Sequence, residues 1–385
     1  MGNESHLFHS VSKFLNKHVQ LNHVYRILFF VIGLSLGIII SLYLKNFSLT
    51  IQASLFPLPT TPPPPQPPSK DMKDVVMVHN MSDVVMMHNM SDGELLLRAS
   101  TMVSRNYHKQ LLVPKVALMF LTKGPLPLAP LWEKFLEGHE GLYSIYVHSH
   151  PDFVETLPPT SVFFDRRIPS QPVFWGTGTM IDAERRLLAN ALLDLSNQRF
   201  VLLSESCIPL FDFKTIYDYL INSNSSFLGS FDDPRRPGRG RYSPRMWPVI
   251  NITDWRKGSQ WFELHRDLAV HVISDTKYYA IFNVHCRHPC YMDEHYIPTL
   301  VNMLYPELNS NRTTTWVDWS RGGAHPRKFE WNDITDEFLN QIRYGSECMY
   351  NGNVTSLCFL FARKFLPSTL EPLLRVGPLL LGFDP

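Results

Sequence analysis

The sequence has no excess of charge of either sign. It holds 36 lysines and arginines against 35 aspartates and glutamates, which gives a formal net charge of +1. Proteins that bind nucleic acid or another acidic polymer usually carry a basic excess or a basic run. We therefore expect no nucleic-acid partner, and the function has to be inferred from particular sites.

Two common catalytic signatures are missing as well. No glycine-rich phosphate loop is accompanied by a Lys-Ser or Lys-Thr pair, and no Gly-x-Ser-x-Gly sequence occurs. The first signature cradles nucleotide phosphates on backbone N–H groups, and the second exposes a nucleophilic serine on a sharp turn. Their absence weakens a kinase or a serine-hydrolase interpretation.

Cysteine is scarce. The chain has five cysteines, so at least one thiol stays unpaired within it. Cys286 and Cys290 lie with two histidines in residues 285–290, a composition that suggests zinc. Structural zinc usually takes four ligands from paired, separated clusters, and Pro289 limits how tightly this segment can wrap. We favour a disulfide or separate thiols over a zinc site here.

Charged residues are absent from residues 27–44, the only long apolar run in the chain. As a helix this run would be about 27 Å long, near the hydrocarbon thickness of early secretory membranes. A cleaved signal peptide, the alternative, has a shorter apolar core of about 7–15 residues. Three basic residues precede the run and Lys45 alone follows it closely. This predicts a cytoplasmic tail at 1–26, a transmembrane signal anchor at 27–44, and a single-pass type II protein of the Golgi membrane with a lumenal catalytic domain.

The segment after this run is rich in proline. Residues 57–68 favour the extended polyproline II conformation of a stalk. A tandem repeat at 74–91 is either a His/Met metal-binding tract or a duplicated piece of stem, and its histidines define no ligand geometry. We assign residues 45–114 to a proline-rich stem and 115–385 to one lumenal domain. Asn-x-Ser/Thr sequences compatible with lumenal exposure occur at Asn80, Asn89, Asn224, Asn251, Asn311 and Asn353.

Apolar runs and helical patterns alternate along the lumenal domain. The apolar runs lie at 116–121, 142–148, 161–164 and 199–204. Apolar residues at helical spacing predict one helix with Thr179 as its N-cap and another capped by Asp212. The alternation predicts an α/β fold with a mostly parallel sheet and helices on both faces. Ligands of such folds bind at the carboxyl ends of the strands, so the loops there are the places to look for a site.

Charged residues in three segments have two interpretations each. Glu294 and the aspartate before it begin a helical stretch, where acids stabilise the positive end of the helix dipole, but they could instead carry chemistry. Lys364 and the arginine before it end an apolar strand pattern, where they are either solvated or placed to meet a diphosphate. Asp232 and Asp233 resemble a metal-binding pair, although the arginines that follow could neutralise them. The residues alone leave these alternatives open.

Taken together, several segments resemble the core-2/I-branching β-1,6-N-acetylglucosaminyltransferase family, particularly its plant branch. The resemblance runs from Lys115 to the C-terminal region, and the order and spacing of the segments make it specific. The segments are Val173-FWG, Leu202-LSESCIPL, Cys290-YMDEHYIPT, Trp316-VDW, Cys348-MYNG and Cys358-FLFARKF.

The resemblance implies a GT-A-like, Rossmann-type transferase that inverts the anomeric centre in a single displacement. Glu294 matches the acid of the family's Asp-Glu motif and would be the general base that deprotonates the acceptor hydroxyl. Lys364 would contact the diphosphate of the leaving UDP, with Arg343 as a second cation. Because these cations would take the place of a metal, the resemblance implies no metal and no other cofactor.

The resemblance also implies the ligands. The donor would be a UDP-sugar, with UDP-N-acetylglucosamine as the first expectation, and the acceptor a glycan or glycoprotein. Thr122 and Lys123 would contact the donor at the first strand exit, and His148 stands where relatives place an aspartate near the nucleoside. The acceptor region corresponds broadly to residues 235–245. Two alternatives remain: a membrane-tethered glycan-binding or scaffolding protein with a degenerate transferase fold, and a transferase that uses UDP-glucuronic acid.

Overall fold

The computed structural model describes residue 30 and residues 88–102 and 112–383. The chain divides into two units, Met1–Met77 and Val78–Pro385, and every helix and strand named below belongs to the second. Within the described ranges, no helix combines the length and the apolar character that a membrane crossing requires. The transmembrane segment at 27–44 lies outside these ranges except for Phe30, so it stays a prediction.

A four-stranded sheet lies at the centre of the domain, in the order β2-β1-β3-β5. Its strands are β1 (Lys115–Leu121), β2 (Tyr143–His148), β3 (Asn197–Ser204) and β5 (Glu263–His265). The first three are parallel, and β5 pairs antiparallel with β3. The apolar run at 161–164 forms bends and turns rather than a strand. The chain changes direction at Asp165, whose φ is 52°. Phe163 is buried within this turn region.

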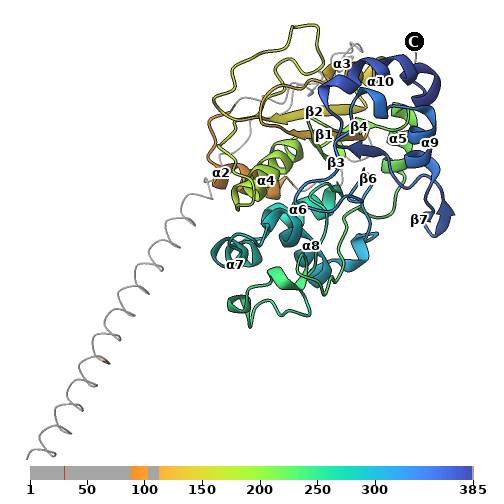
Figure 1. The fold of residues 1–385 in the computed structure, drawn as a ribbon. Helices are drawn as coiled ribbons and strands as arrows, with labels where there is room; N and C mark the ends of the chain where they lie inside the picture. The colour runs from red at the N-terminus through yellow and green to blue at the C-terminus, as the bar shows by residue number, and fades with distance from the viewer. Residues whose placement is uncertain (1–29, 31–87, 103–111, 384–385) are drawn as a thin grey trace, which may run out of the picture. The chain divides into compact units, whose positions relative to one another are not determined.

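Helices cover both faces of this sheet (Figure 1). On one side the core includes residues of α4 (Thr179–Leu192), α6 (Arg266–Ser274), α7 (Lys277–His285) and α8 (Met292–Leu304). On the other side it includes α3 (Ala129–Leu136), α5 (Phe213–Ile221), α9 (Asp336–Tyr344) and α10 (Leu370–Val376). Ala117 and Met119 of β1 enter the first core, and Leu118 and Phe120 enter the second. A strand buried on both faces is what the continuous apolar run predicts, and the layering fits a GT-A-like fold.

A second, smaller sheet has the order β4-β9-β6. Its strands are β4 (Ile208–Pro209), β6 (Thr315–Val317) and β9 (Phe361–Arg363), and β7 (Cys348–Tyr350) forms a separate hairpin with β8 (Asn353–Thr355). Disulfides join Cys286 to Cys290 and Cys348 to Cys358, which confirms the disulfide interpretation of the first pair. The unpaired thiol is the buried Cys207.

Two helix starts test the predicted caps. The side chain of Asp212 accepts a hydrogen bond from Thr215 N at 2.8 Å, so the predicted cap of α5 is confirmed. The predicted cap of α4 is wrong, because Thr179 is its first residue and follows Gly178. The Thr179 hydroxyl instead accepts a hydrogen bond from Phe174 N at 2.9 Å. It therefore holds the loop before the helix rather than the helix end.

Helix α2 (Asp92–Thr101) falls within residues 45–114, which the sequence assigns to the stem. Ser91 caps the helix, and Glu94 completes a capping box. Leu95 and Ala99 are buried where α2 packs against α4 and α6, and Figure 1 shows α2 beside α4. The packed part of the chain therefore includes residues that precede β1.

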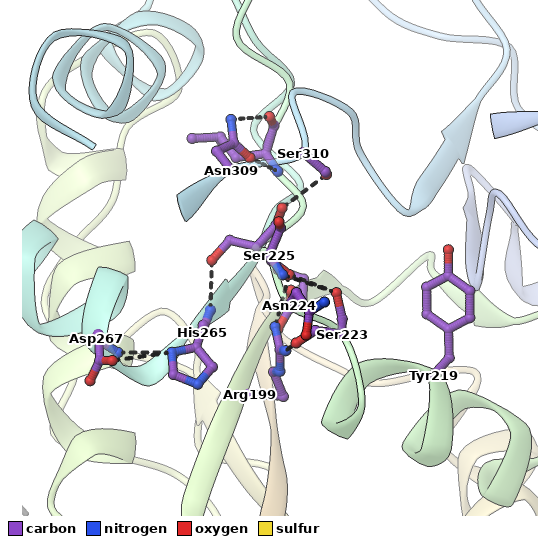
Figure 2. Close-up of polar contacts among 12 residues, drawn as sticks. Arg199, Tyr219, Ser223, Asn224, Ser225, His265, Asp267, Asn309 and Ser310 are labelled. Atoms are coloured by element: carbon purple, nitrogen blue, oxygen red, sulfur yellow. Dashed lines mark hydrogen bonds and ion pairs between the residues drawn. The ribbon is translucent and has the colours of Figure 1, made fainter. Parts of the chain in front are cut away.

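A buried charged cluster lies toward the amino end of β3 (Figure 2). Arg199 donates hydrogen bonds to the backbone carbonyls of Ser223 and Ser225, and it lies 3.5 Å from Glu263. Burial raises the pKa of Glu263 to about 7, against the opposing effect of Arg199. Because the arginine bonds mainly to backbone, this cluster joins β3 to the loop after α5 and to β5. Its position and its bonds are those of a structural element.

Candidate active site at the carboxyl edge of the sheet

Three strands of the central sheet end at the same level. Leu121 of β1 pairs with His148 of β2 and with Ser204 of β3. The backbone N–H of Thr122 continues this pairing and donates to His148 O at 2.9 Å. The residues that follow these ends, including Glu205, therefore share one edge, the edge at which α/β folds bind ligands.

A fourth segment, residues 257–262, crosses this edge and is called the edge segment below. Leu202 N donates to Phe262 O at 3.0 Å, and β5 runs antiparallel to β3, so the residues before Phe262 extend past the end of β3. Gly258 permits a close approach within this segment, because a Cβ atom there would lie 2.1 Å from Gly229 O. The edge segment is thus held against the rest of the domain by backbone contact.

Glu294 lies in the first turn of α8, and its carbonyl oxygen accepts a hydrogen bond from Gly258 N at 2.8 Å. Its Oε2 atom accepts hydrogen bonds from Arg241 and from Lys257 Nζ, the latter at 2.9 Å. Burial by itself would raise the pKa of Glu294, but Lys257 and Arg241 outweigh burial and hold that pKa below its usual value. Both cations bind Oε2, so Oε1 has no hydrogen-bond donor among the described residues. An ionised carboxylate with one open oxygen can accept a proton from a hydroxyl group.

Two more carboxyl groups lie near Glu294. Burial, followed by the charge of Glu294, raises the pKa of Asp293 to about 6. Glu184 of α4 is fully buried, and burial together with Asp293 raises its pKa well above the usual value. Gln260 of the edge segment donates to Glu184 at 2.9 Å. Of the three carboxyl groups, Glu294 is the one whose surroundings favour the charged form.

Basic side chains approach the same edge from the end of β9. Phe365 N donates to Ser206 O at 3.0 Å, which places the exit of β9 beside the exit of β3. Phe329 N donates to Lys364 O at 2.9 Å, so the residues around 328 lie beside the same exit. Two segments distant in the sequence therefore deliver their charges to one place.

The resulting group contains Lys123, Lys328, Arg363 and Lys364, and is called the cation cluster below. Burial and then the charge of Arg363 lower the pKa of Lys364, while Lys328 and Lys123 add to this effect and Glu205 opposes it. In the part of the chain that the structure describes, none of the four forms an ion pair with a carboxylate within 4 Å, in contrast to neighbouring Arg327. Crowded cations that form no close ion pair with a carboxylate favour binding of an anion.

Arg363 also connects the cluster to the edge segment. Its guanidinium carbon lies 3.9 Å from the ring centroid of Trp261, and the indole is buried. The edge segment thus contacts the cation cluster through Trp261 and contacts Glu294 through Lys257. One short segment therefore connects the base candidate to the cations, which makes them a candidate for a single site.

Arg343, the predicted second cation, lies elsewhere. Its guanidinium carbon is 4.7 Å from the ring centroid of Phe211. Leu210 N donates to Leu360 O, so Phe211 lies beside the residues that precede β9, whereas Lys364 follows that strand. At about 3.3 Å per residue, Leu360 and Lys364 are separated by roughly 13 Å along the chain. The structure therefore brings Lys328 and Arg363 to Lys364, and not Arg343.

The predicted donor contacts at β1 differ from each other. The hydroxyl of Thr122 is buried and donates to Gly124 O at 3.1 Å, so it stabilises the turn after the strand. Lys123 is exposed on the same turn and belongs to the cation cluster. In this arrangement Lys123 is free to reach a ligand, while the Thr122 side chain is already engaged.

His148 is buried at the end of β2, and its Nε2 atom lies 2.9 Å from Arg186 Nη1. A guanidinium group can only donate, so Nε2 accepts and the imidazole is neutral with its proton on Nδ1. Burial and then Arg186 lower the pKa of His148 to about 4. Arg186 also forms two hydrogen bonds with Asp92 of α2, at 2.8 and 2.6 Å. One arginine thus links α2 to the strand end where the nucleoside is predicted.

The acidic pair that could have held a metal is neutralised by arginines. Arg239 forms two hydrogen bonds to Asp232, at 2.7 and 2.6 Å, and Arg235 contacts Asp233 at 2.8 and 3.0 Å. Within the described ranges, no group of three or more His, Cys, Asp or Glu side chains is arranged to hold a metal ion. The neutralisation alternative therefore describes this pair.

Three site residues were missed in the sequence. Arg241 falls within the 235–245 stretch assigned broadly to the acceptor, but nothing there singled it out as a partner of Glu294. Lys257 follows an arginine within a loop, and that basic pair was its available signal. Lys328 follows an arginine in a basic pair, and that pair was the available signal.

The family model described as Core-2/I-Branching enzyme matches residues 116–343. A rice protein (Oryza sativa subsp. japonica), glycosyltransferase BC10, is 38% identical over 298 residues, which is 65% of this chain and 73% of the rice protein. The family match includes β1 from Val116 onward, the edge segment and Glu294, whereas Lys364 follows it and α2 precedes it.

Proposed function

The chain belongs to the Core-2/I-branching enzyme family, and from that premise we propose that it is a glycosyltransferase that moves a sugar from a UDP-sugar to a glycan or glycoprotein. The family and the similarity to a rice glycosyltransferase support the class of reaction. N-acetylglucosamine is the proposed sugar, because that is the donor that the family resemblance implies.

One observation carries this proposal. At one end, the carboxyl edge of the central sheet has an ionised carboxylate with an open oxygen. At the other end it has four cations that form no ion pair with a carboxylate of the described ranges. Transfer from a nucleotide sugar needs both: a group that removes a proton from the acceptor, and positive charge that stabilises the leaving diphosphate.

The proposed step is a single displacement. Oε1 of Glu294 takes the proton of the acceptor hydroxyl, and that oxygen forms a bond to the anomeric carbon. The bond from the anomeric carbon to the diphosphate oxygen breaks on the opposite side, and its electron pair leaves with UDP. Lys364, with Lys328, Lys123 and Arg363, stabilises the charge that develops on the diphosphate. The configuration at the anomeric carbon is inverted.

We propose that the reaction needs no metal. Two observations support this: the cation cluster could supply positive charge to a diphosphate, and the Asp232-Asp233 pair is engaged by arginines. We further propose that the domain works in the Golgi lumen behind a type II anchor. The apolar run at 27–44 and two disulfides support that location, since disulfides persist in oxidising compartments.

A screen of UDP-sugars tests the proposal. The full chain in detergent is incubated with each UDP-sugar, with and without EDTA, and release of UDP is measured. We expect UDP-N-acetylglucosamine to be hydrolysed fastest and EDTA to have no effect. Preference for UDP-glucuronic acid would change the donor, and loss of activity in EDTA would refute metal independence. Absence of UDP-sugar binding, combined with reproducible binding on a glycan array, would replace the transferase by a glycan-binding protein.

A further inference from the structure

Three aromatic rings from different loops meet beside Glu294. The ring centroids of Trp175 and Tyr291 are 5.0 Å apart, and those of Trp175 and His325 are 5.3 Å apart. Trp175 remains 51% exposed, although it touches two other rings. We call these three residues the aromatic platform.

The loop that carries Trp175 is held firmly in place. Thr177 Oγ1 donates to Phe174 O at 2.8 Å, and Thr179 Oγ1 accepts from Phe174 N. Gly176 has a φ of 78°, and a Cβ atom there would lie 3.3 Å from the ring of His288. A side chain at position 176 would be strained and crowded, so the glycine lets the loop lie against the opposite loop.

The loop that carries Tyr291 shows a similar constraint. Tyr291 has a φ of 55°, an uncommon left-handed conformation for a bulky residue. The Cys286–Cys290 disulfide closes the loop directly before it. Strained backbone of this kind persists where surrounding structure enforces it, and it is often found at ligand sites. An exposed indole that rests on a fixed ring differs from a single surface aromatic, which needs no explanation.

The platform contacts the part of the site around Glu294, and one of its residues is close in sequence to the cation cluster. The guanidinium carbon of Arg241 lies 4.3 Å from the centroid of Tyr291, and Arg241 donates to Glu294. At the other side, His325 is three residues before Lys328 of the cation cluster. A ligand on the exposed face of Trp175 would therefore lie beside the base and its arginine, and it would contact the segment that carries Lys328 through His325.

We propose that the aromatic platform binds the pyranose ring of the acceptor sugar, stacked on Trp175, with Arg241 hydrogen-bonded to one of its hydroxyls. A pyranose presents C–H groups on its face and hydroxyls on its rim, which suits an aromatic surface edged by a charged pair. The acceptor is favoured over the donor sugar, because Tyr291 of the platform lies beside the proposed base. The backbone N–H of Glu294 donates to Tyr291 O at 3.0 Å. This proposal rests on the proposed transferase function.

Ligand-observed NMR on the full chain tests it. Saturation transfer to methyl β-D-galactopyranoside and methyl β-D-xylopyranoside is measured with UDP bound, with sorbitol as a polyol that has no ring. Binding of at least one pyranoside is expected, and Trp175→Ala should weaken it by about fivefold or more, the lower range for removal of a stacked aromatic ring. Trp175→Phe should retain part of the affinity. UDP affinity should stay within twofold of the unchanged protein in both variants.

Phe174→Ala is the matched control. Phe174 is 61% exposed on the same loop and contacts no other ring among the described residues, so its removal should leave pyranoside binding unchanged. An equal loss in both alanine variants would assign the effect to the loop and overturn the proposal. A loss of UDP affinity in Trp175→Ala would assign the platform to the donor and overturn it as well. Failure of the unchanged protein to bind UDP would instead refute the proposed function.

Discussion

The two ends of the active-site edge differ in how their charges are satisfied. At the base end, Glu294 is in contact with two cations, and its pKa is held low. At the cation end, the four positive side chains have no carboxylate partner within the described ranges, and the pKa of Lys364 is lowered. The carboxylate at the base end already has its counter-charges, whereas the cations at the other end could still take an anion as theirs. If the proposed function is right, the cation end is the one that depends on the diphosphate for its counter-charge.

Replacing the base should give the largest effect. Glu294→Gln keeps the shape of the side chain but cannot take up a proton, so transfer should fall by about 10²- to 10⁴-fold. UDP affinity, measured by calorimetry, should stay within about twofold, because the base end does not hold the diphosphate. A Glu294→Gln protein that transfers sugar at the full rate would refute the base assignment and with it the division of the site into two ends.

The second-largest effect is expected when a cation of the cluster is removed, and it should appear in UDP binding. Lys364→Met should weaken UDP binding about 10- to 100-fold, as expected for the loss of a hydrogen bond to a charged group. Arg343→Met is the matched control, because methionine keeps apolar contact with Phe211 but removes the charge. We expect it to change UDP affinity less than about threefold. If Arg343→Met weakened UDP binding as much as Lys364→Met does, the cation cluster defined here would be wrong.

The pattern of apolar residues in the sequence predicted much of the fold, whereas the sequence predicted only part of the candidate site. The runs at 116–121, 142–148 and 199–204 lie in strands because most of their residues are apolar and buried, as burial on both faces requires. The run at 161–164 has the same composition, but a turn at Asp165 prevents pairing. Periodicity reports which residues are buried and not what they pair with.

The sequence could identify some of the site residues but not others. Glu294 and Lys364 lie in segments whose order and spacing resemble a family, so the sequence could point to them. Lys257, Lys328 and the α2 contact with α4 come from loops and from a helix far away in the chain, and only tertiary contact defines them. Arg343 was named from the family resemblance, and a match of segments along the chain gives no information about which end of a strand a side chain approaches.

A pH profile tests whether the cations at the base end set the ionisation of Glu294. Lys257→Met removes one of the two cations that lower the pKa of Glu294, so burial is less strongly opposed and that pKa should rise. The base works only when ionised, so the acid limb of kcat/KM should move to higher pH, while the plateau at high pH should remain near that of the unchanged protein. Arg235→Met, which changes a cation that pairs with Asp233, should leave the limb where it is. A limb that stays in place in Lys257→Met would mean that Lys257 does not set the ionisation of Glu294.

The smallest effect is expected farthest from the reacting atoms, at α2. Asp92→Asn weakens the contact that holds Arg186 against His148, but Asp92 is about half exposed, so the loss of stability should stay within about 1 kcal/mol. If His148 lies at the nucleoside, UDP affinity should fall two- to threefold, because Arg186 is then less firmly held beside the imidazole. Arg98→Gln, on the exposed side of the same helix, should change neither quantity. Equal UDP affinity in Asp92→Asn and in the unchanged protein would confine α2 to a packing role and leave the donor site to the strand ends and the cation cluster.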